Sequence, residues 1–364
     1  MVDLNFYKNK KVFITGHTGF KGSWLCIVLE MAGAEVMGYS LAPQTEPALF
    51  ELCDFSDEKS SLQSVFSDIR DLKMLTNTMQ NFQPEIVIHM AAQPIVRDSY
   101  SDPVYTYETN VMGTVNILEA VRNCKSVRSF LNVTTDKVYE NKEWAWGYRE
   151  NEPLDGYDPY SNSKSCSELV THSYQKSFFS DPKKRRIGIS TARAGNVIGG
   201  GDFANDRIIP DCVRSAFEKK PIIVRSSDSI RPYQHVLEPL FAYLMIAQKQ
   251  YEELTFAGYY NVGPNEEDCI TTGQLVSLFC KKWDSDQTWE NRSIDGPHEA
   301  NFLKLDCSKI KTTFGWHPRW NVETAIEKTV EWTKAYVMGK AIYPVMQTQI
   351  LAFINDNTLR RSVK

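Results

Sequence analysis

The chain has 364 residues, of which 42% are hydrophobic and 24% charged, and its formal net charge is −4. This size fits one large or two medium domains, and the near-neutral charge gives no sign of a nucleic-acid or anionic-membrane partner. No apolar run approaches the roughly 18–20 residues of a membrane span, and the polar residues 1–11 contain no apolar signal region. The eight cysteines are scattered, without C-x-x-C or a His/Cys cluster at metal spacing. We therefore expect reduced thiols, a cytoplasmic protein and no bound metal.

The first predicted strand, at residues 11–15, runs directly into a glycine-rich turn. The turn reads Gly16-His-Thr-Gly-Phe-Lys-Gly22, and an apolar-periodic helix follows from Trp24 to Met31. Strand, glycine turn and helix in this order place a pyrophosphate on the helix N-terminus. The spacing is G-x-x-G-x-x-G rather than G-x-G-x-x-G, so an ordinary strand-to-helix turn is the alternative, but both flanks favour a dinucleotide. The residues assigned to cofactor binding here are Gly16, Thr18, Gly19, Phe20, Lys21 and Gly22.

The second predicted strand, at residues 35–40, bears on the choice between NAD and NADP. It ends in Gly-Tyr-Ser, without the Asp or Glu that commonly binds the adenosine ribose. Between Tyr39 and Phe50 there is also no Arg or Lys to pair with a 2′-phosphate. NAD is therefore favoured over NADP, and Ser40 at the strand end is assigned to the cofactor.

A third strand is predicted within residues 64–71, which end in Asp68-Ile-Arg-Asp71. An acid at this place can hold the adenine amino group of a cofactor, so Asp68 and Ile69 are also assigned to cofactor binding. Asp71 as the N-cap of a following helix is an equally good interpretation of the acidic run.

Further strands are predicted at residues 86–89, 130–134 and 187–194, and a helix at residues 107–121. Strands that alternate with helices predict an α/β fold with a Rossmann-like, doubly wound parallel sheet, whose ligands bind at the carboxyl ends of the strands. The small residues after the fourth strand would let a cofactor pass over it, whereas His89 is interpreted as a structural histidine. The remaining predicted cofactor contacts are Ala91, Ala92, Gln93, Asn110 and Thr134.

The strongest chemical pattern lies between the fifth strand and the helix that follows it. Tyr160 and Lys164 are four residues apart, so both side chains leave the same helix face. An ammonium beside a phenol stabilises the phenolate, and such a tyrosine can take a proton from a substrate hydroxyl. Thr135, at the strand end, can hydrogen-bond the same hydroxyl. A surface tyrosine and a solvated lysine are the alternative, because a lone Y-x-x-x-K is common.

The second half of the chain changes its pattern after about residue 200. Short strands at residues 221–224 and 258–262 alternate with helices at 208–219, 236–249, 271–282 and 322–337. We expect residues 1–200 to form the NAD-binding domain and residues 201–364 mainly a smaller substrate-binding lobe, with some exchange of chain between them. Arginine matches phosphate oxygens bidentately, so Arg207 and Arg231 are candidates for clamping a diphosphate. The predicted substrate contacts are Gln93, Thr135, Asn196, Arg207, Arg231 and His298.

Taken together, these motifs resemble an extended short-chain dehydrogenase/reductase over residues 11–336. The resemblance rests on the glycine turn, on Ala91-Ala92, on the pair Thr135-Asp136 and on Tyr160-x-x-x-Lys164. Within that superfamily the chain is most similar to the nucleotide-sugar 4,6-dehydratases. Three segments are similar to the branch that acts on CDP-glucose: Thr134-Thr-Asp-Lys-Val-Tyr-Glu-Asn141, Arg193-Ala-Gly-Asn-Val-Ile-Gly-Gly-Gly-Asp202 and Arg231-Pro-Tyr-Gln-His235.

The resemblance implies a mechanism and a set of catalytic residues: Thr135, Asp136, Lys137, Tyr160 and Lys164. Tyr160 would take the O4 proton while NAD takes hydride from C4, a base would remove the C5 proton, and Asp136 would protonate the leaving C6 hydroxyl. Hydride would then return to C6, so that NAD is regenerated in each turnover. The chain departs from its relatives at Lys137, where the dTDP-glucose and GDP-mannose enzymes carry Glu as the C5 base. We interpret Lys137 as that base.

The resemblance also implies a biological setting and leaves alternatives open. Such enzymes make CDP-4-keto-6-deoxyglucose for the dideoxysugars of bacterial O-antigen polysaccharides, and we expect a homodimer or homotetramer. A net oxidoreductase or epimerase of the same fold would not need the pair Asp136-Lys137. An NAD-sensing regulator would need no Tyr160 and Lys164. A dehydratase of UDP- or dTDP-hexoses is the third alternative.

Overall fold

The fold is described in a computed structural model, which covers residues 2–55, 60–181, 185–284, 286–292 and 302–356. Its centre is a seven-stranded sheet with the order β11-β6-β5-β4-β1-β2-β3, and every neighbouring pair is parallel. This confirms the predicted doubly wound α/β class. The strands are β1 (Lys11–Thr15), β2 (Glu35–Ser40), β3 (Leu62–Phe66), β4 (Ile86–His89), β5 (Ser129–Thr135), β6 (Gly188–Ala194) and β11 (Tyr259–Val262).

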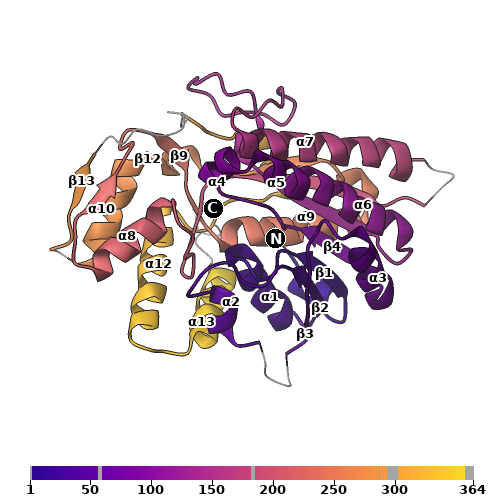
Figure 1. The fold of residues 1–364 in the computed structure, drawn as a ribbon, viewed down its shortest axis with the longest axis horizontal. Coiled ribbons are helices and arrows are strands. Elements are labelled where there is room, and N and C mark those ends of the chain that lie inside the picture. The colour runs from indigo at the N-terminus through magenta and orange to yellow at the C-terminus, as the bar shows by residue number, and fades with distance from the viewer. Residues whose placement is uncertain (1, 56–59, 182–184, 285, 293–301, 357–364) are drawn as a thin grey trace, which may run out of the picture.

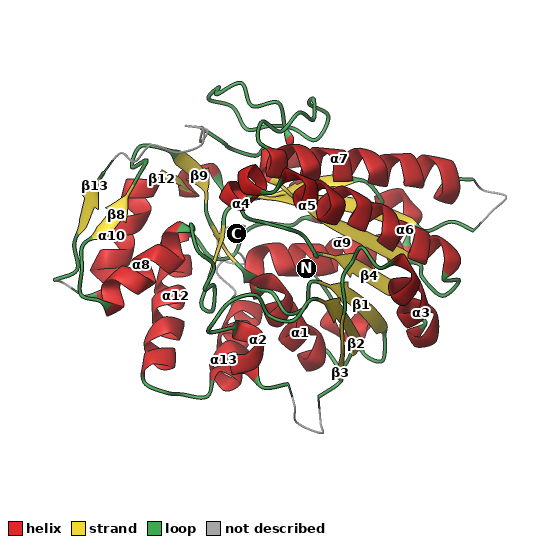
Figure 2. Ribbon diagram, in the orientation of Figure 1, coloured by secondary structure: helices red, strands yellow, loops and turns green. Residues whose placement is uncertain are grey.

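Helices cover both faces of this sheet (Figure 1, Figure 2). One face carries α3 (Leu72–Phe82), α6 (Gly113–Asn123) and α7 (Pro159–Tyr174), and the other carries α1 (Phe20–Met31) and α9 (Leu237–Glu252). The strands serve both layers because successive side chains point to opposite faces. In β1, Val12 and Ile14 join the core under α1 and α9, whereas Phe13 joins the core under α3 and α6.

The smaller lobe lies beside the sheet domain, on the left in Figure 1. Its core packs α8 (Ile208–Phe217), α10 (Thr272–Trp283) and α12 (Val322–Val337) around Leu275, Val276 and Phe279. Its strands form three short pairs: β7 (Val197–Ile198) with β10 (Gln234–His235), β8 (Ile222–Val224) with β13 (Trp289–Asn291), and β9 (Ile230–Pro232) with β12 (Cys269–Thr271). The remaining helices are α2 (Leu49–Cys53), α4 (Val96–Ser101), α5 (Pro103–Tyr107), α11 (Ser308–Phe314) and α13 (Ile342–Asn355).

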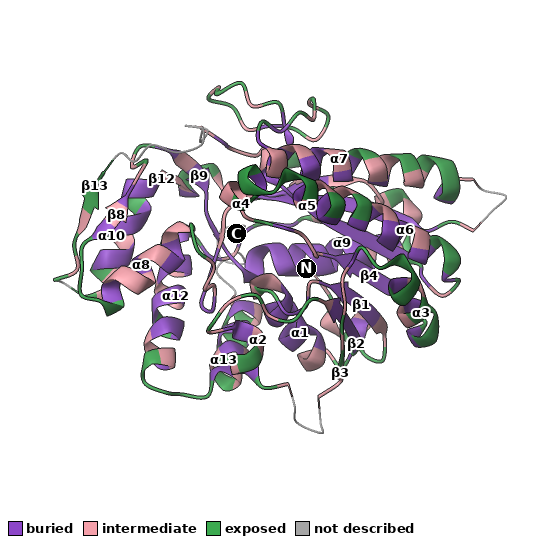
Figure 3. Ribbon diagram, in the orientation of Figure 1, coloured by how far each residue is buried: buried purple, intermediate pink, exposed green. Residues whose placement is uncertain are grey.

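Two elements that the sequence placed in the substrate lobe belong to the sheet domain instead. Strand β11 pairs in parallel with β6 and forms the edge of the large sheet. Helix α9, which precedes it, packs on β5 and β6 and is buried along most of its length (Figure 3). The sequence allowed some exchange of chain between the two parts but did not identify these elements, because a short apolar run does not reveal which strand it pairs with.

Smaller differences concern local boundaries. Strand β3 ends at Phe66, earlier than predicted, so Asp68 lies in the loop that follows. Asp71 accepts a hydrogen bond from the Met74 amide and caps α3, as its alternative interpretation required. The predicted helix at residues 107–121 is a continuous helical run in which η2 (Glu108–Met112) is a π-helical segment between α5 and α6. No helix in the described part of the chain is both long and apolar enough to span a membrane.

A buried ion pair joins β5, β6 and α7 beneath the carboxyl end of the sheet. Both side chains of the pair, Glu168 on α7 and Arg193 on β6, are fully buried. Arg193 donates from Nε and Nη2 to the two carboxylate oxygens of Glu168, at 3.0 Å each. Thr134 on β5 and Thr191 on β6 also donate to that carboxylate, at 2.5 and 2.7 Å. The position of α7 over the strand ends is thereby fixed by four hydrogen bonds to one side chain.

We expect Glu168→Ala to lower the free energy of unfolding by about 3–5 kcal/mol, because it leaves the Arg193 guanidinium buried without its counter-charge. Urea titration of the wild type and the variant measures this difference. The matched control is Glu331→Ala, which removes the carboxylate of an exposed ion pair with Lys328 and should cost less than about 1 kcal/mol. Equal losses in the two variants would contradict the role given to the buried pair.

Candidate active site

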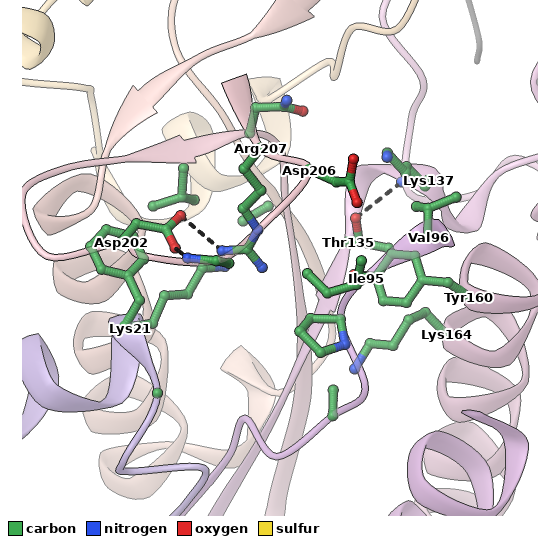
Figure 4. Close-up of a pocket in the computed structure, with 18 of the residues that line it drawn as sticks. Lys21, Ile95, Val96, Thr135, Lys137, Tyr160, Lys164, Asp202, Asp206 and Arg207 are labelled. Carbon is green, nitrogen blue, oxygen red and sulfur yellow. Dashed lines mark hydrogen bonds and ion pairs between the residues drawn. The ribbon is translucent and has the colours of Figure 1, made fainter. Parts of the chain in front are cut away.

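A large cavity of about 1130 Å³ lies at the carboxyl ends of β1, β4, β5 and β6, where a parallel sheet binds its ligands. The glycine turn lines one end, the start of α7 lines the middle, and residues of the smaller lobe close the other side. Figure 4 shows how Lys21, Tyr160, Lys164 and Arg207 converge on this space from different elements. Residues from across the chain therefore meet at one place.

The glycine turn is tightly built and its geometry fits a pyrophosphate. Gly16 has φ +78°, and a Cβ there would lie 2.8 Å from the Ala91 amide nitrogen. A Cβ at Gly22 would lie 2.2 Å from the Gly16 carbonyl oxygen. Gly19 is the N-cap of α1 and supplies no side-chain cap, so the first amides of that helix are available to an anion. The predicted role of the turn is consistent with this placement.

The adenosine end of the cavity is lined by Ser40, Asp68 and Ile69. Ser40 shares a hydrogen bond of 2.8 Å with Thr18, which ties the end of β2 to the glycine turn. Asp68 is held by Arg70 at 2.8 Å, and this bond keeps the pKa of the Asp68 carboxyl below its usual value. The segments 39–49 and 67–69 contribute no lysine or arginine to the cavity lining; the cations that line it come from other segments and are Lys21, Arg97, Lys137, Lys164, Arg207, Arg225 and Arg231.

Two predicted contacts, Gln93 and Asn110, stand behind the cavity wall. The Gln93 amide donates to Asn110 Oδ1 at 2.8 Å, and Asn110 Nδ2 donates to the Gln93 carbonyl and to Ser163 Oγ. Both side chains are buried, and neither lines the cavity, whereas Ala91 and Ala92 do. Gln93 and Asn110 therefore brace the loop after β4 against α7, and their contact with a ligand stays a prediction. Buried His89 bonds Thr15 and is structural, as predicted.

Thr135, Asp136 and Lys137 lie at the carboxyl end of β5. Thr135 ends the strand, and the other two begin the short 3-10 helix η3 (Asp136–Val138). The Thr135 hydroxyl donates to Asp136 Oδ1 at 2.9 Å. Asp136 is 1% exposed, and this burial raises the pKa of its carboxyl against the opposing effect of Lys137. A raised pKa favours the protonated form that a general acid needs.

Tyr160 and Lys164 project from the first turns of α7 into the cavity. Asp158 caps this helix by accepting from the Ser161 amide at 2.9 Å, and Pro159 occupies its first position, a typical helix start. Lys164 Nζ donates to the Val133 carbonyl at 2.9 Å. Burial lowers the pKa of Lys164 to about 8.

The phenol does not have the lowered pKa that the sequence suggested. Burial raises the pKa of Tyr160 to about 12, and a hydrogen bond with Thr135 only partly opposes this shift. Desolvation disfavours the phenolate more than its neighbours stabilise it, and the Lys164 ammonium is held by the Val133 carbonyl. Burial therefore favours the protonated form of Tyr160.

The predicted substrate side is brought together in part. Asn196, Arg207 and Arg231 line the cavity, and Arg231 is 7% exposed. Arg207 Nη1 bonds the buried Asp202 carboxylate at 2.9 Å. The remaining predicted contact, His298, lies outside the described residues.

Several residues of the site were not found by sequence reasoning. Asp206 bridges Arg97 and Arg225 across the cavity, at 3.5 and 3.1 Å, and no local pattern announces such a bridge. Asp202 was seen only as part of a glycine-rich segment. Glu168 carries the one usable signal, because it lies four residues after Lys164 and so one turn along the same helix face.

The geometry can be compared with known proteins. A sequence model described as GDP-mannose 4,6 dehydratase matches residues 13–329. The CDP-glucose 4,6-dehydratase of Salmonella typhimurium is 47% identical over 361 residues, which are 98% of this chain and 100% of that protein. A probable dTDP-glucose 4,6-dehydratase of Sinorhizobium fredii is 27% identical over 88% of this chain and 92% of its own.

Solved structures agree with the fold. The dTDP-glucose 4,6-dehydratase of Bacillus anthracis in complex with NAD has a TM-score of 0.74 at 21% identity, covering 92% of this chain and 99% of its own. The UDP-glucose 4-epimerase of Thermotoga maritima with UDP-glucose has a TM-score of 0.77 at 19% identity, over 90% and 99% of the two chains. The family match along most of the sequence, with the threonine, acid, tyrosine and lysine in one cavity, shows that this chain belongs to the nucleotide-sugar 4,6-dehydratase family.

Proposed function

We propose that the chain catalyses the NAD-dependent 4,6-dehydration of CDP-glucose to CDP-4-keto-6-deoxyglucose. The observation that carries this function is the buried Asp136 in the same cavity as Tyr160 and Lys164. Oxidation of a hydroxyl needs only the tyrosine and the lysine, whereas loss of water from C6 also needs an acid for the leaving hydroxyl. The 47% identity to a CDP-glucose 4,6-dehydratase over almost the whole chain supports the same reaction.

NAD fits the glycine-turn end of the cavity. The N-terminus of α1 would hold its pyrophosphate, and the small side chains of Ala91 and Ala92 would leave room for it above β4. When bound, NAD supplies the redox chemistry, oxidising C4 of the sugar and later reducing C6.

The residues of the chain handle the protons. Tyr160 accepts the O4 proton, Thr135 orients that hydroxyl, and Lys164 holds a positive charge near the phenol. Asp136, whose pKa is raised by burial, donates a proton to the departing C6 hydroxyl. Lys137 lines the cavity on the turn that follows Asp136 and is the proposed base for C5.

The substrate diphosphate is assigned to the cationic side of the cavity. Arg207 and Arg231 lie there, and guanidinium groups bind phosphate oxygens bidentately. These side chains would serve any nucleoside diphosphate, so the preference for cytidine is supported by the relative alone. The smaller lobe is proposed to bind the substrate, and α9 and β11 are proposed to belong to the NAD-binding domain.

The setting of the enzyme is also proposed. We place it in the cytoplasm, in the synthesis of sugars for bacterial O-antigen polysaccharides, as the resemblance implies. Exposed apolar side chains on neighbouring elements support self-association as a homodimer or homotetramer: Val104 (67% exposed) on α5, Met112 (51%) on η2 and Leu169 (53%) on α7.

NAD should bind more tightly than NADP, because no Arg or Lys lines the adenosine end of the cavity within the described residues. Isothermal titration calorimetry of the cofactor-free protein with each dinucleotide measures both dissociation constants. Ser40→Arg is the matched variant: a guanidinium at the end of β2 should narrow the difference by binding the 2′-phosphate. Tighter binding of NADP to the wild type would reject the preference.

CDP-glucose carrying deuterium at C4 should give a product with deuterium at C6, and no free NADH should accumulate. This outcome follows if one bound cofactor oxidises and reduces the same sugar. Mass spectrometry and NMR locate the label, and kcat/KM is measured for CDP-, dTDP- and UDP-glucose and for GDP-mannose. Build-up of NADH in proportion to product would mean a net dehydrogenase. A larger kcat/KM for another nucleotide would refute the cytidine preference.

Lys137→Ala should still oxidise C4, so enzyme-bound NADH appears on mixing, but exchange of the C5 hydrogen with deuterated solvent should fall by about 10²–10⁴-fold. The physical reason is the loss of the group that accepts the C5 proton. Stopped-flow absorbance follows the bound NADH, and NMR follows the exchange. The control is Lys142→Ala, which removes an exposed lysine of the neighbouring loop that pairs with Glu140. Exchange at the wild-type rate in Lys137→Ala would show that another group is the base.

A further inference from the structure

The proposed dehydration requires a proton to pass from Tyr160 to Asp136 in each turnover. Loss of water from the sugar moves one proton from O4 to the departing C6 hydroxyl, while the C5 proton leaves and returns. The redox changes at C4 and C6 do not alter this count. Tyr160 therefore gains one proton in each turnover, and Asp136 loses one. The reaction ends with a phenol and a carboxylate, but it needs a phenolate and a carboxylic acid to begin.

The Thr135 hydroxyl connects these two groups. This hydroxyl donates to Asp136 Oδ1 at 2.9 Å, and it lies close enough to the Tyr160 phenol to influence the pKa of that group. A hydroxyl can donate one hydrogen bond and accept two, so a threonine that donates to the carboxylate is left to accept from the phenol. Figure 4 shows Tyr160 and Thr135 side by side at the cavity wall. The direction of this chain, from phenol through hydroxyl to carboxylate, is the direction in which the proton has to move.

The second oxygen of Asp136 faces the other way. Asp136 Oδ2 is buried and has no hydrogen-bond partner among the described residues. A Cβ placed on Gly195 would lie 3.1 Å from this oxygen and 2.5 Å from Pro232 Cγ, so the backbone at Gly195 packs closely against the carboxylate. Asp136 lines the cavity, so it can receive a proton on Oδ1 from Thr135 and deliver it to the C6 hydroxyl after rotation of the carboxyl.

We infer that Tyr160, Thr135 and Asp136 form a proton relay that holds one shared proton. The Tyr160 O–H bond breaks as its proton passes to Thr135, whose own hydroxyl proton passes to Asp136. This leaves a phenolate, an intact threonine and a carboxylic acid. The phenolate then takes the O4 proton, and Asp136 gives its proton to the leaving hydroxyl, which departs as water. The three side chains return to their starting protonation without exchanging a proton with solvent. This inference rests on the proposed function.

The charges around the relay suit a proton that is shared rather than released. Asp136 is faced by the cations Lys137, Arg231 and Lys21, and Tyr160 by Arg207 and the carboxylates of Asp136 and Asp158. A negative charge on Asp136 disfavours a negative charge on Tyr160, and the reverse also holds, so the two groups titrate as one coupled unit. Moving the proton within the pair keeps the total charge of the buried site constant.

Proton release during C4 oxidation separates this relay from a threonine that only orients the substrate. The holoenzyme is mixed with CDP-glucose in weak buffer containing an indicator dye, and bound NADH is followed in parallel. In the wild type we expect bound NADH to form with no transient release of a proton. If the phenol instead ionises to solvent, one proton per active site is released in this phase, and that result would overturn the relay.

Asp136→Asn removes the end of the relay and keeps Thr135 and Tyr160. This variant should still oxidise C4, but one proton should be released for each NADH formed. Its oxidation rate should rise about tenfold per pH unit below the pKa of the phenol, whereas the wild-type rate stays flat over the same range. No release and a flat profile in Asp136→Asn would also overturn the relay.

Thr135 variants supply the second arm of the test. Thr135→Ser retains a hydroxyl and should behave as the wild type in the dye experiment. Thr135→Val removes the hydroxyl without changing the shape much, and the C4 oxidation that remains should release a proton. A valine variant that oxidises C4 without release would show that the proton does not pass through this side chain. A failure of all variants and of the wild type to oxidise CDP-glucose would instead count against the proposed function.

Discussion

The buried pair of Glu168 and Arg193 is the interaction on which the geometry of the site depends. Two charges removed from water are costly unless their hydrogen-bonding capacity is satisfied. Here one carboxylate accepts from Arg193 and from threonines on β5 and β6, so three elements are locked at one point. Because Lys164 lies one turn before Glu168 on α7, the same lock sets where the lysine ammonium lies. It is held by the Val133 carbonyl on β5.

This arrangement places Tyr160 over the end of β5 and makes the electrostatics of the cavity follow from burial. Desolvation favours the neutral form of every titratable group. It raises the pKa of Tyr160 and of Asp136 and lowers that of Lys164. Burial thereby favours the protonated carboxyl that the proposed acid Asp136 needs. It disfavours the phenolate that the proposed base Tyr160 needs. The proposed function requires Tyr160 to lose its proton despite this burial. The neighbouring carboxylate of Asp136 can accept that proton.

The sequence predicted the parts of the site that depend on local spacing. The glycine turn, the residues after β5 and the pair Tyr160 and Lys164 are each set by a few neighbouring residues, and the structure brings them into one cavity. Longer-range pairing could not be predicted: the sequence allowed some exchange of chain between the lobes but did not identify β11 and α9 as the exchanged elements, since a strand's partner is not encoded in its own residues. The hydrogen bonds between Gln93 and Asn110 were not predicted, since the two residues are far apart in sequence and belong to different elements. The pKa of Tyr160 was misjudged because burial cannot be read from an i,i+4 spacing.

The fold alone does not separate a dehydratase from an epimerase. A UDP-glucose 4-epimerase and a dTDP-glucose 4,6-dehydratase superpose on this chain about equally well, with TM-scores of 0.77 and 0.74, so the difference in chemistry has to lie in side chains. In the proposed mechanism the oxidation of C4 uses Tyr160 and Lys164 on α7, and an epimerase needs that step as well. Elimination of water needs an additional acid placed next to the same sugar. The proposed acid of this chain lies in η3, one residue beyond the threonine that ends β5. Asp136 is 1% exposed, and its carboxyl accepts a hydrogen bond from the Thr135 hydroxyl. The acid proposed for dehydration alone is therefore in direct contact with the threonine proposed for C4 oxidation, which both reactions need.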